Sequence, residues 1–328
     1  MNPHPYDDLS PARVLDAVDG LGLISDGRLL ALNSYENRVY QVGIEGGEPV
    51  VAKFYRPGRW SRAQLEEEHA FLFELAQAEL GVVAPLGEPG RSLHWREPFW
   101  FALFPRRGGR SPELNFDTLE LLGHSLGKLH ALGAQQRFTA REALSVDNFA
   151  IASAEFLLRE NFIPADLRVA YESLVRDVVQ RLRAHWQEAL ALKLKMNLRL
   201  HGDCHLGNIL VRDDQVFLVD FDDCRSGPAI QDLWMLLSGE REQCQAQLSA
   251  LIEGYALFHD FDARELMLVE TLRTLRLMHY SAWLARRWSD PAFGRSFPWF
   301  NTPRYWAQHV LELREQLAAL DEAPLRLY

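Results

Sequence analysis

The sequence predicts an α+β protein with two lobes, a small lobe built on an antiparallel sheet and a larger, mainly helical lobe. Three observations indicate this fold class. Short apolar runs with β character alternate with turns in the first third of the chain, helical spacing of apolar residues dominates the remainder, and one polar β-hairpin interrupts the helical part at residues 199–223. The chain has 328 residues, of which 48% are hydrophobic, so it can bury a large core. We place the two lobes at residues 1–104 and 105–328.

The composition argues against several classes of protein. The net charge is −10 and the pI is about 5.6, which argues against a protein that binds nucleic acid or a membrane surface. The N-terminus lacks the basic and apolar regions of a signal peptide, and no apolar run is long enough to span a bilayer. The three cysteines form no C-x-x-C pair, and we expect Cys204 and Cys224 to serve packing. We therefore expect a cytoplasmic protein that acts as a monomer.

The small lobe is predicted to begin with a helix from Ser10 to about Val18, because a serine followed by proline is a typical helix start. Three strands then follow at residues 29–34, 38–42 and 49–55.

A second helix is predicted at residues 60–78, where Leu65, Leu72 and Leu75 recur at helical spacing. Glu68 lies on the same stripe, whereas the two glutamates before it are better placed toward solvent. Residues 82–86 and 99–104 are predicted to be the last strands of the lobe.

The large lobe is predicted to contain helices at residues 116–132, 154–160, 170–194, 262–288 and 305–320. Gly133 is expected to be the C′ residue of the first of these helices. Asp232 stands at the start of a further short helix, which its side chain would cap. His130 is expected to be a packed residue rather than a catalyst.

The polar hairpin carries the residues with the clearest chemistry. Its strands, at residues 209–211 and 216–219, flank a polar turn. Before them stand His201, Asp203 and Asn208 at the spacing H-x-D-x-x-x-x-N of a kinase catalytic loop, and Asp220 opens a D-F-D sequence at the end of the second strand. This hairpin would hold three oxygen-bearing side chains around one point.

Phosphoryl transfer from ATP explains these residue types. Mg²⁺ prefers oxygen ligands and usually takes one or two carboxylates together with phosphates and water, which Asn208 and Asp220 suit. Asp203 would orient the acceptor hydroxyl and take its proton. The alternation of His201, Asp203 and His205 also permits a zinc site, but zinc would leave Asn208 and the D-F-D sequence without a role.

Lys53 lies in the apolar strand V-V-A-K-F, close to the V-A-I-K pattern of the third kinase strand. A lysine inside an apolar strand needs an anionic partner, unless it extends to solvent from an edge strand. Glu68 is our choice for an ion pair that holds Lys53 on the α- and β-phosphates of ATP.

The sequence H-G-D-x-H-x-x-N followed by V-D-F-D-D resembles the aminoglycoside phosphotransferase/choline kinase branch of the protein-kinase-like fold. The stretches L-N-S-Y-E-N-R-V-Y-Q and G-P-A-I-Q-D-L-W and an aromatic C-terminus are similar to the bacterial stress response kinase A family over nearly the whole chain. That resemblance implies a serine/threonine protein kinase that also phosphorylates itself and acts in the stress response. It also implies an ATP contact at Ser34 and a bracing role for Asp232 on the catalytic loop.

The acceptor, the role of Asp222 and the role of the C-terminal aromatic residues stay open. The rivals of a protein substrate are a small-molecule acceptor, such as an amino alcohol, sugar or aminoglycoside, and a pseudokinase scaffold that only binds nucleotide. Asp222 would assist a second metal or stabilise its loop. His279, Tyr280 and the aromatic residues between 283 and 306 would line the acceptor pocket or form core.

Overall fold

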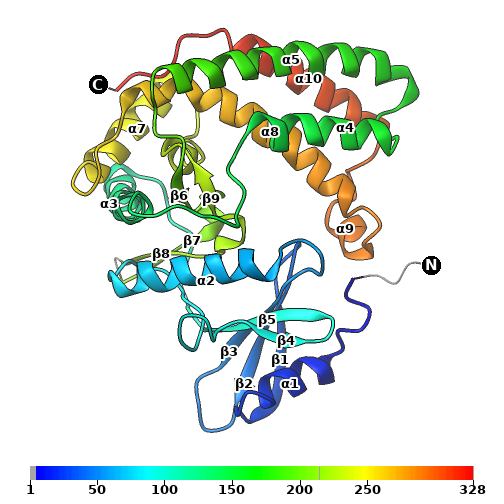
Figure 1. Ribbon diagram of the computed structural model, residues 1–328, viewed down its shortest axis with the longest axis vertical. Helices are drawn as coiled ribbons and strands as arrows, with labels where there is room; N and C mark the ends of the chain where they lie inside the picture. The colour runs from blue at the N-terminus through cyan, green and yellow to red at the C-terminus, as the bar shows by residue number, and fades with distance from the viewer. Residues whose placement is uncertain (1–4, 214, 328) are drawn as a thin grey trace.

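The computed structural model describes residues 5–213 and 215–327. Figure 1 separates two lobes, with α1 (Pro11–Asp19), α2 (Arg62–Gln77) and one sheet in the lower lobe and the other helices in the upper lobe. The sheet has the order β1-β2-β3-β5-β4, and every neighbouring pair is antiparallel. Its strands are β1 Ser25–Leu32, β2 Arg38–Ile44, β3 Val50–Phe54, β4 His94–Arg96 and β5 Phe99–Pro105. The predicted fold class is confirmed.

The two helices of the small lobe begin at polar caps. The Ser10 hydroxyl accepts a hydrogen bond from the backbone N–H of Arg13, and Pro11 opens the helix. In α2, Ser61 and Gln64 form a capping box. The buried face of α2 includes Leu65, Leu72 and Leu75, and Glu68 is buried among them.

Lys53 occupies the middle of the sheet. It lies opposite Val39 on β2 and Ala102 on β5. Because strands pair with β3 on both sides, Lys53 does not lie on an edge strand from which its ammonium group could extend to solvent. Its side chain is buried, which requires the anionic partners described below.

The large lobe consists of helices around two short β-pairs, β6 with β9 and β7 with β8. Its α-helices are α3 Phe116–Gly133, α4 Ala152–Arg159, α5 Ala165–Ala191, α6 Ile230–Trp234, α7 Arg241–Tyr255, α8 Val269–Arg286, α9 Pro291–Ser296 and α10 Pro303–Ala319. A π-helical turn at Asp147–Ile151 and 3₁₀ turns at Leu206–Asn208, Phe221–Asp223 and Ala263–Leu268 complete the helical elements of the described residues. The strands are β6 Leu198–Leu200, β7 Ile209–Arg212, β8 Gln215–Leu218 and β9 Arg225–Gly227.

Helices α3 and α7 approach each other closely through glycines. A Cβ added at Gly123 would lie 2.1 Å from the carbonyl oxygen of Leu251, and one at Gly254 would lie 2.1 Å from that of Glu120. Only a residue without a side chain fits at these two contacts. His130 of α3 and Tyr255 of α7 are also hydrogen-bonded across this contact.

Several predicted elements differ from the structure. Residues 82–86 form no strand, because Val82 makes only one isolated bridge, to Leu218 of β8, and the backbone at Gly81 is pressed against Val216. The segment is thus an irregular link between the lobes. Gly133 is the last residue of α3 rather than its C′ residue, and a Cβ there would lie 2.3 Å from the carbonyl oxygen of Arg199.

The predicted helix at residues 262–288 is divided, since a 3₁₀ turn at Ala263–Leu268 precedes α8. The predicted hairpin is present, with Ile209 opposite Leu218 and Val211 opposite Val216. Among the described residues, no helix has both the length and the apolar character needed to cross a membrane.

Candidate active site

A cavity of about 600 Å³ lies between the lobes. It is lined by the β1–β2 loop, the catalytic loop, the D-F-D segment and α8. Of the predicted site residues, the structure places Ser34, Asp203, Asn208 and Asp220 on its wall. The remaining two, Lys53 and Glu68, are buried.

The catalytic loop is held by Asp232 of α6, which is fully buried. Its carboxylate accepts the backbone N–H groups of His201 and Gly202, each at 2.8 Å, and lies 3.1 Å from Nε2 of His130. The other ring nitrogen of His130 is 2.8 Å from the hydroxyl of Tyr255. Asp232 lies inside the helix and does not cap it, so the capping prediction is wrong and Asp232 braces the loop.

Asp203 faces the cavity from this loop. One carboxylate oxygen forms an ion pair with Nη1 of Arg276 from α8, and the other lies 3.5 Å from Nε2 of His205. Burial alone would raise the pKa of Asp203, but the hydrogen bond from His205 and the charge of Arg276 outweigh burial and hold that pKa well below its usual range. The side chain is therefore a carboxylate. Sequence reasoning missed Arg276, for which no local pattern exists.

Asn208 and Asp220 supply the other oxygen groups. The amide nitrogen of Asn208 donates to the carbonyl oxygen of Asp203 at 3.0 Å, which leaves the amide oxygen as its free end among the described contacts. Asp220 follows β8 in a left-handed backbone conformation with φ 60° and ψ 65°, and its side chain is half-exposed. Two oxygen donors on one cavity wall fit a divalent cation that takes its remaining ligands from phosphates and water.

Lys53 contacts three carboxylates. Its Nζ lies 3.0 Å from Oδ1 of Asp220, 3.4 Å from Oδ1 of Asp222 and 3.8 Å from Oε1 of Glu68. Burial would lower the pKa of Lys53, but these carboxylates raise it well above its ordinary value, so the ammonium stays charged. Glu68 is in turn bound by Arg141, whose Nη2 lies 2.7 Å from Oε2.

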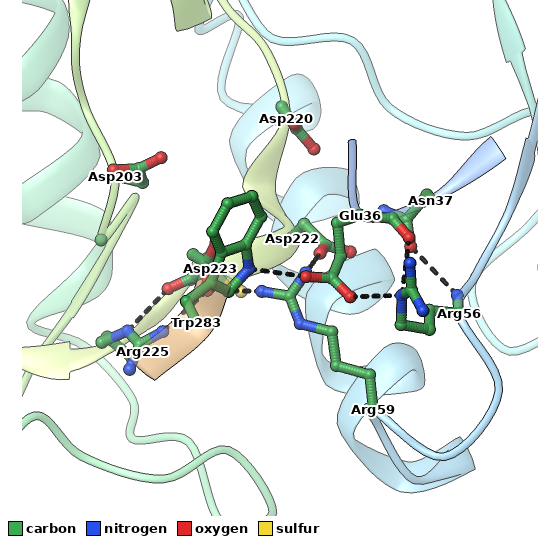
Figure 2. Close-up of polar contacts among 12 residues, drawn as sticks. Glu36, Asn37, Arg56, Arg59, Asp203, Asp220, Asp222, Asp223, Arg225 and Trp283 are labelled. Carbon is green, nitrogen blue, oxygen red and sulfur yellow. Dashed lines mark hydrogen bonds and ion pairs between the residues drawn. The ribbon is translucent and has the colours of Figure 1, made fainter. Parts of the chain in front are cut away.

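Glu36 of the β1–β2 loop joins the lobes, as Figure 2 shows. Its carboxylate accepts a hydrogen bond from Nε1 of Trp283 at 2.7 Å and pairs with Nε of Arg56 at 2.9 Å and Nε of Arg287 at 2.5 Å. Because Trp283 belongs to α8 and Arg287 follows it, the loop is attached to the large lobe. No local pattern in L-N-S-Y-E-N singles out Glu36.

Asp222 is buried and paired with Arg59, to which Figure 2 draws a contact, and with Lys53. Arg59 also binds Asp223 at 2.8 Å, and Arg225 binds Asp223 at 2.9 Å. These contacts hold the D-F-D segment in place.

The C-terminal aromatic residues fall into two groups by position. His279, Tyr280, Trp283 and Phe297 line the cavity. Phe293, Phe300 and Trp306 are buried in the core instead. Tyr35 of the β1–β2 loop contacts Phe297 with ring centroids 4.8 Å apart, and both rings line the cavity.

The zinc alternative finds no support among the described residues. Nε2 of His201 is bonded to the carbonyl oxygen of Val219 at 2.9 Å, and Nδ1 accepts the backbone N–H of Asp203 at 3.3 Å. Both ring nitrogens are thereby occupied, and residues 5–213 and 215–327 contain no group of three or more His, Cys, Asp or Glu able to hold a metal. Cys204 and Cys224 are buried thiols, as packing requires.

Comparisons with known proteins identify the family of this chain. Residues 28–269 match the family described as "Phosphotransferase enzyme family". The chain is 42% identical over 323 residues to "Stress response kinase A" of Escherichia coli (strain K12), covering 98% of this chain and 97% of the relative. It is 41% identical over 327 residues to "Serine/threonine protein kinase RdoA" of Salmonella typhimurium, covering 99% and 98%.

Solved structures share the fold at low identity. An amicoumacin kinase in complex with AMP-PNP, Ca²⁺ and Ami has a TM-score of 0.71 at 19% identity, covering 97% of each chain. A microcompartment-associated aminopropanol kinase has a TM-score of 0.67 at 18% identity, covering 93% of this chain and 95% of that one. The chain therefore belongs to the phosphotransferase enzyme family and, within it, to the stress response kinase A family.

Proposed function

We propose that this member of the phosphotransferase family transfers the γ-phosphoryl group of ATP, bound with Mg²⁺, to serine or threonine hydroxyls of proteins, including its own, in the response to stress. The observation that carries the proposal is the placing of Asp203, Asn208 and Asp220 on one cavity wall, with Lys53 bound to Asp220. A base, two oxygen ligands and a cation are the parts that phosphoryl transfer needs.

Asp203 acts as the base in this mechanism. Its carboxylate is ionised and reaches the cavity, so it can accept the proton of an acceptor hydroxyl. The hydroxyl oxygen forms a bond to the γ-phosphorus, the bond between that phosphorus and the β–γ bridging oxygen breaks, and ADP leaves.

The remaining site residues position the nucleotide. Asn208 and Asp220 would hold Mg²⁺, which when bound neutralises charge on the phosphate oxygens. Lys53, fixed by Glu68, directs its ammonium group to the α- and β-phosphates. Ser34 lines the cavity from the β1–β2 loop, which would cover the phosphates.

The name of the Salmonella relative supports a protein acceptor. The second candidate is a small-molecule kinase, which is favoured by the aromatic contact of Tyr35 with Phe297 at the cavity wall and by the names of the structural neighbours. A nucleotide-binding scaffold is not favoured, because Lys53, Asn208 and Asp220 are all present.

The test is a transfer assay with the full chain, Mg²⁺ and radiolabelled ATP, offered generic protein acceptors and a panel of small alcohols. We expect label in protein, and we expect Asp203→Ala to lose transfer while it still binds ATP. Label confined to small alcohols would overturn the protein acceptor. Undiminished transfer by Asp203→Ala would overturn the assignment of the base.

A further inference from the structure

The carboxylates on the cavity wall are already paired with cations. Asp222 and Asp223 contact Arg59, and Asp223 also contacts Arg225. Asp220 is bound to Lys53. Glu36 is paired likewise, with guanidinium groups of Arg56, Arg59 and Arg287. A cationic amine on an acceptor would therefore meet no unpaired carboxylate among the described residues of this wall.

Arg276 is different, because it is a cation with unused donors. It lies on α8, its side chain is 38% exposed, and it lines the cavity. Within the described part of the chain its polar contact is the one to Asp203, made through Nη1. A guanidinium carries five N–H donors in a planar fork that matches a carboxylate or a phosphate. The donors that do not contact Asp203 are left for a ligand.

We propose that Arg276 binds an anionic group of the acceptor, a carboxylate or phosphate that lies next to the hydroxyl to be phosphorylated. This inference rests on the proposed function, since it places the acceptor hydroxyl at Asp203. Because Arg276 and Asp203 are in contact, the anion and the hydroxyl must be close neighbours on the acceptor.

The anion would take the guanidinium donors that Asp203 leaves unused, so its binding would place the acceptor hydroxyl beside the carboxylate of Asp203. An acceptor without an anion lacks this contact. In a protein, the matching site is a serine or threonine beside aspartate, glutamate or a phosphorylated residue. In a small molecule, it is a hydroxy acid or an alcohol that carries phosphate.

The experiment compares matched acceptors. One arm uses serine peptides in which the flanking residues are glutamate or, in the control peptide, glutamine. The other arm uses glycerate and glycerol 3-phosphate against glycerol. With wild-type protein we expect kcat/KM to be about 10- to 100-fold higher for the anionic member of at least one arm, as suits a charge-assisted bidentate contact. The arm that shows the preference identifies the source of the anion.

Variants separate ligand binding from a structural role. Arg276→Gln should raise KM for the anionic acceptor and remove the preference, and Arg276→Lys should restore part of it. Arg273→Gln, which removes a charge one turn away on the same helix but outside the cavity lining, should retain the full preference. A purely structural arginine would instead lower transfer to both acceptors by the same factor.

The outcomes also separate this inference from the proposed function. Transfer by wild-type protein with no preference for either anionic acceptor overturns the role of Arg276 and leaves the kinase activity standing. A preference that persists in Arg276→Gln would likewise overturn the role of Arg276 and leave the kinase activity standing. Absence of transfer to every acceptor by protein that binds ATP overturns both. The wild-type comparison alone suffices if the glutamine variant does not fold.

Discussion

Lys53 and Asp220 lie on different lobes, yet Nζ of the lysine is 3.0 Å from Oδ1 of the aspartate. The lysine belongs to the central strand β3 and the aspartate follows β8. The pair thus joins the residue that would hold phosphates to the residue that would hold the metal, so nucleotide binding has to rearrange contacts of both.

Replacing Lys53 tests the role of the Lys53–Asp220 pair. In Lys53→Met the buried carboxylates of Glu68 and Asp222 lose a cation, so we expect the free energy of unfolding to fall by about 3 kcal/mol. Affinity for an ATP analogue should fall as well. Urea denaturation and calorimetric titration measure the two effects, with Lys195→Met, at an exposed position, as the control. Wild-type affinity in Lys53→Met would contradict the role of the lysine.

Asp232 is predicted to be essential for the shape of the catalytic loop. In Asp232→Asn one of the two oxygens becomes an amide nitrogen, which faces a backbone N–H instead of accepting from it. We expect a loss of about 3 kcal/mol in the free energy of unfolding, together with a lower kcat. Urea denaturation and the transfer assay are the measurements, and Asp177→Asn on an exposed helical face is the control. Unchanged values for both would show that the brace is dispensable.

Substitution by alanine is expected to have opposite effects on stability at two helical glycines. Gly123→Ala places a Cβ against the backbone of α7, so we expect it to destabilise the protein by about 1–3 kcal/mol although alanine favours helices. At Gly294 in α9 a Cβ would meet nothing within 4 Å, so Gly294→Ala should be neutral or raise stability by up to about 1 kcal/mol. Thermal unfolding of both variants checks the pair; equal effects would refute the close packing of α3 on α7.

Glu265 is predicted to make stability depend on pH. It is buried and accepts the backbone N–H of Ile230 at 3.0 Å, and burial raises its pKa to about 7 from an ordinary 4.5. Since the folded pKa lies above the unfolded one, its contribution is present below pH 4.5 and is lost as pH rises through 7. Relative to Glu265→Gln, wild-type protein should lose about 3 kcal/mol over this range.

Urea denaturation from pH 5 to pH 8 measures this difference, and the subtraction removes the titration of the buried histidines, which is common to both proteins. Glu253→Gln, at an exposed position, is the matched control. A flat curve for Glu265→Gln as well would contradict the raised pKa.

Local spacing explains which features could be predicted from the sequence. The hairpin, the catalytic-loop residues and the buried position of Glu68 follow from patterns within a few residues of each other, and the structure contains them. Arg276 and Glu36 could not be found this way, because their partners lie 73 and 247 positions away in Asp203 and Trp283.

The wrong predictions for residues 82–86 and for Asp232 arise because their contacts are also distant in sequence. Val82 is a typical strand residue, but its neighbour Gly81 is pressed against the backbone of β8, so Val82 bridges to Leu218 of the other lobe, whereas Leu86 bonds to Leu103 of the sheet. Aspartate is a common N-cap residue, but Asp232 is buried and accepts a hydrogen bond from the backbone of Gly202, 30 positions earlier in the chain. Tertiary contacts overrode local preference at both sites.

The attachment of Glu36 to Trp283 and Arg287 has a kinetic consequence. These contacts attach the β1–β2 loop, which would cover the phosphates, to the large lobe. Release of ADP would then require these buried, paired charges to separate. We therefore expect release of ADP to limit the rate of turnover. A rapid-quench experiment should then show an initial burst of product, and this burst should be smaller in Glu36→Gln.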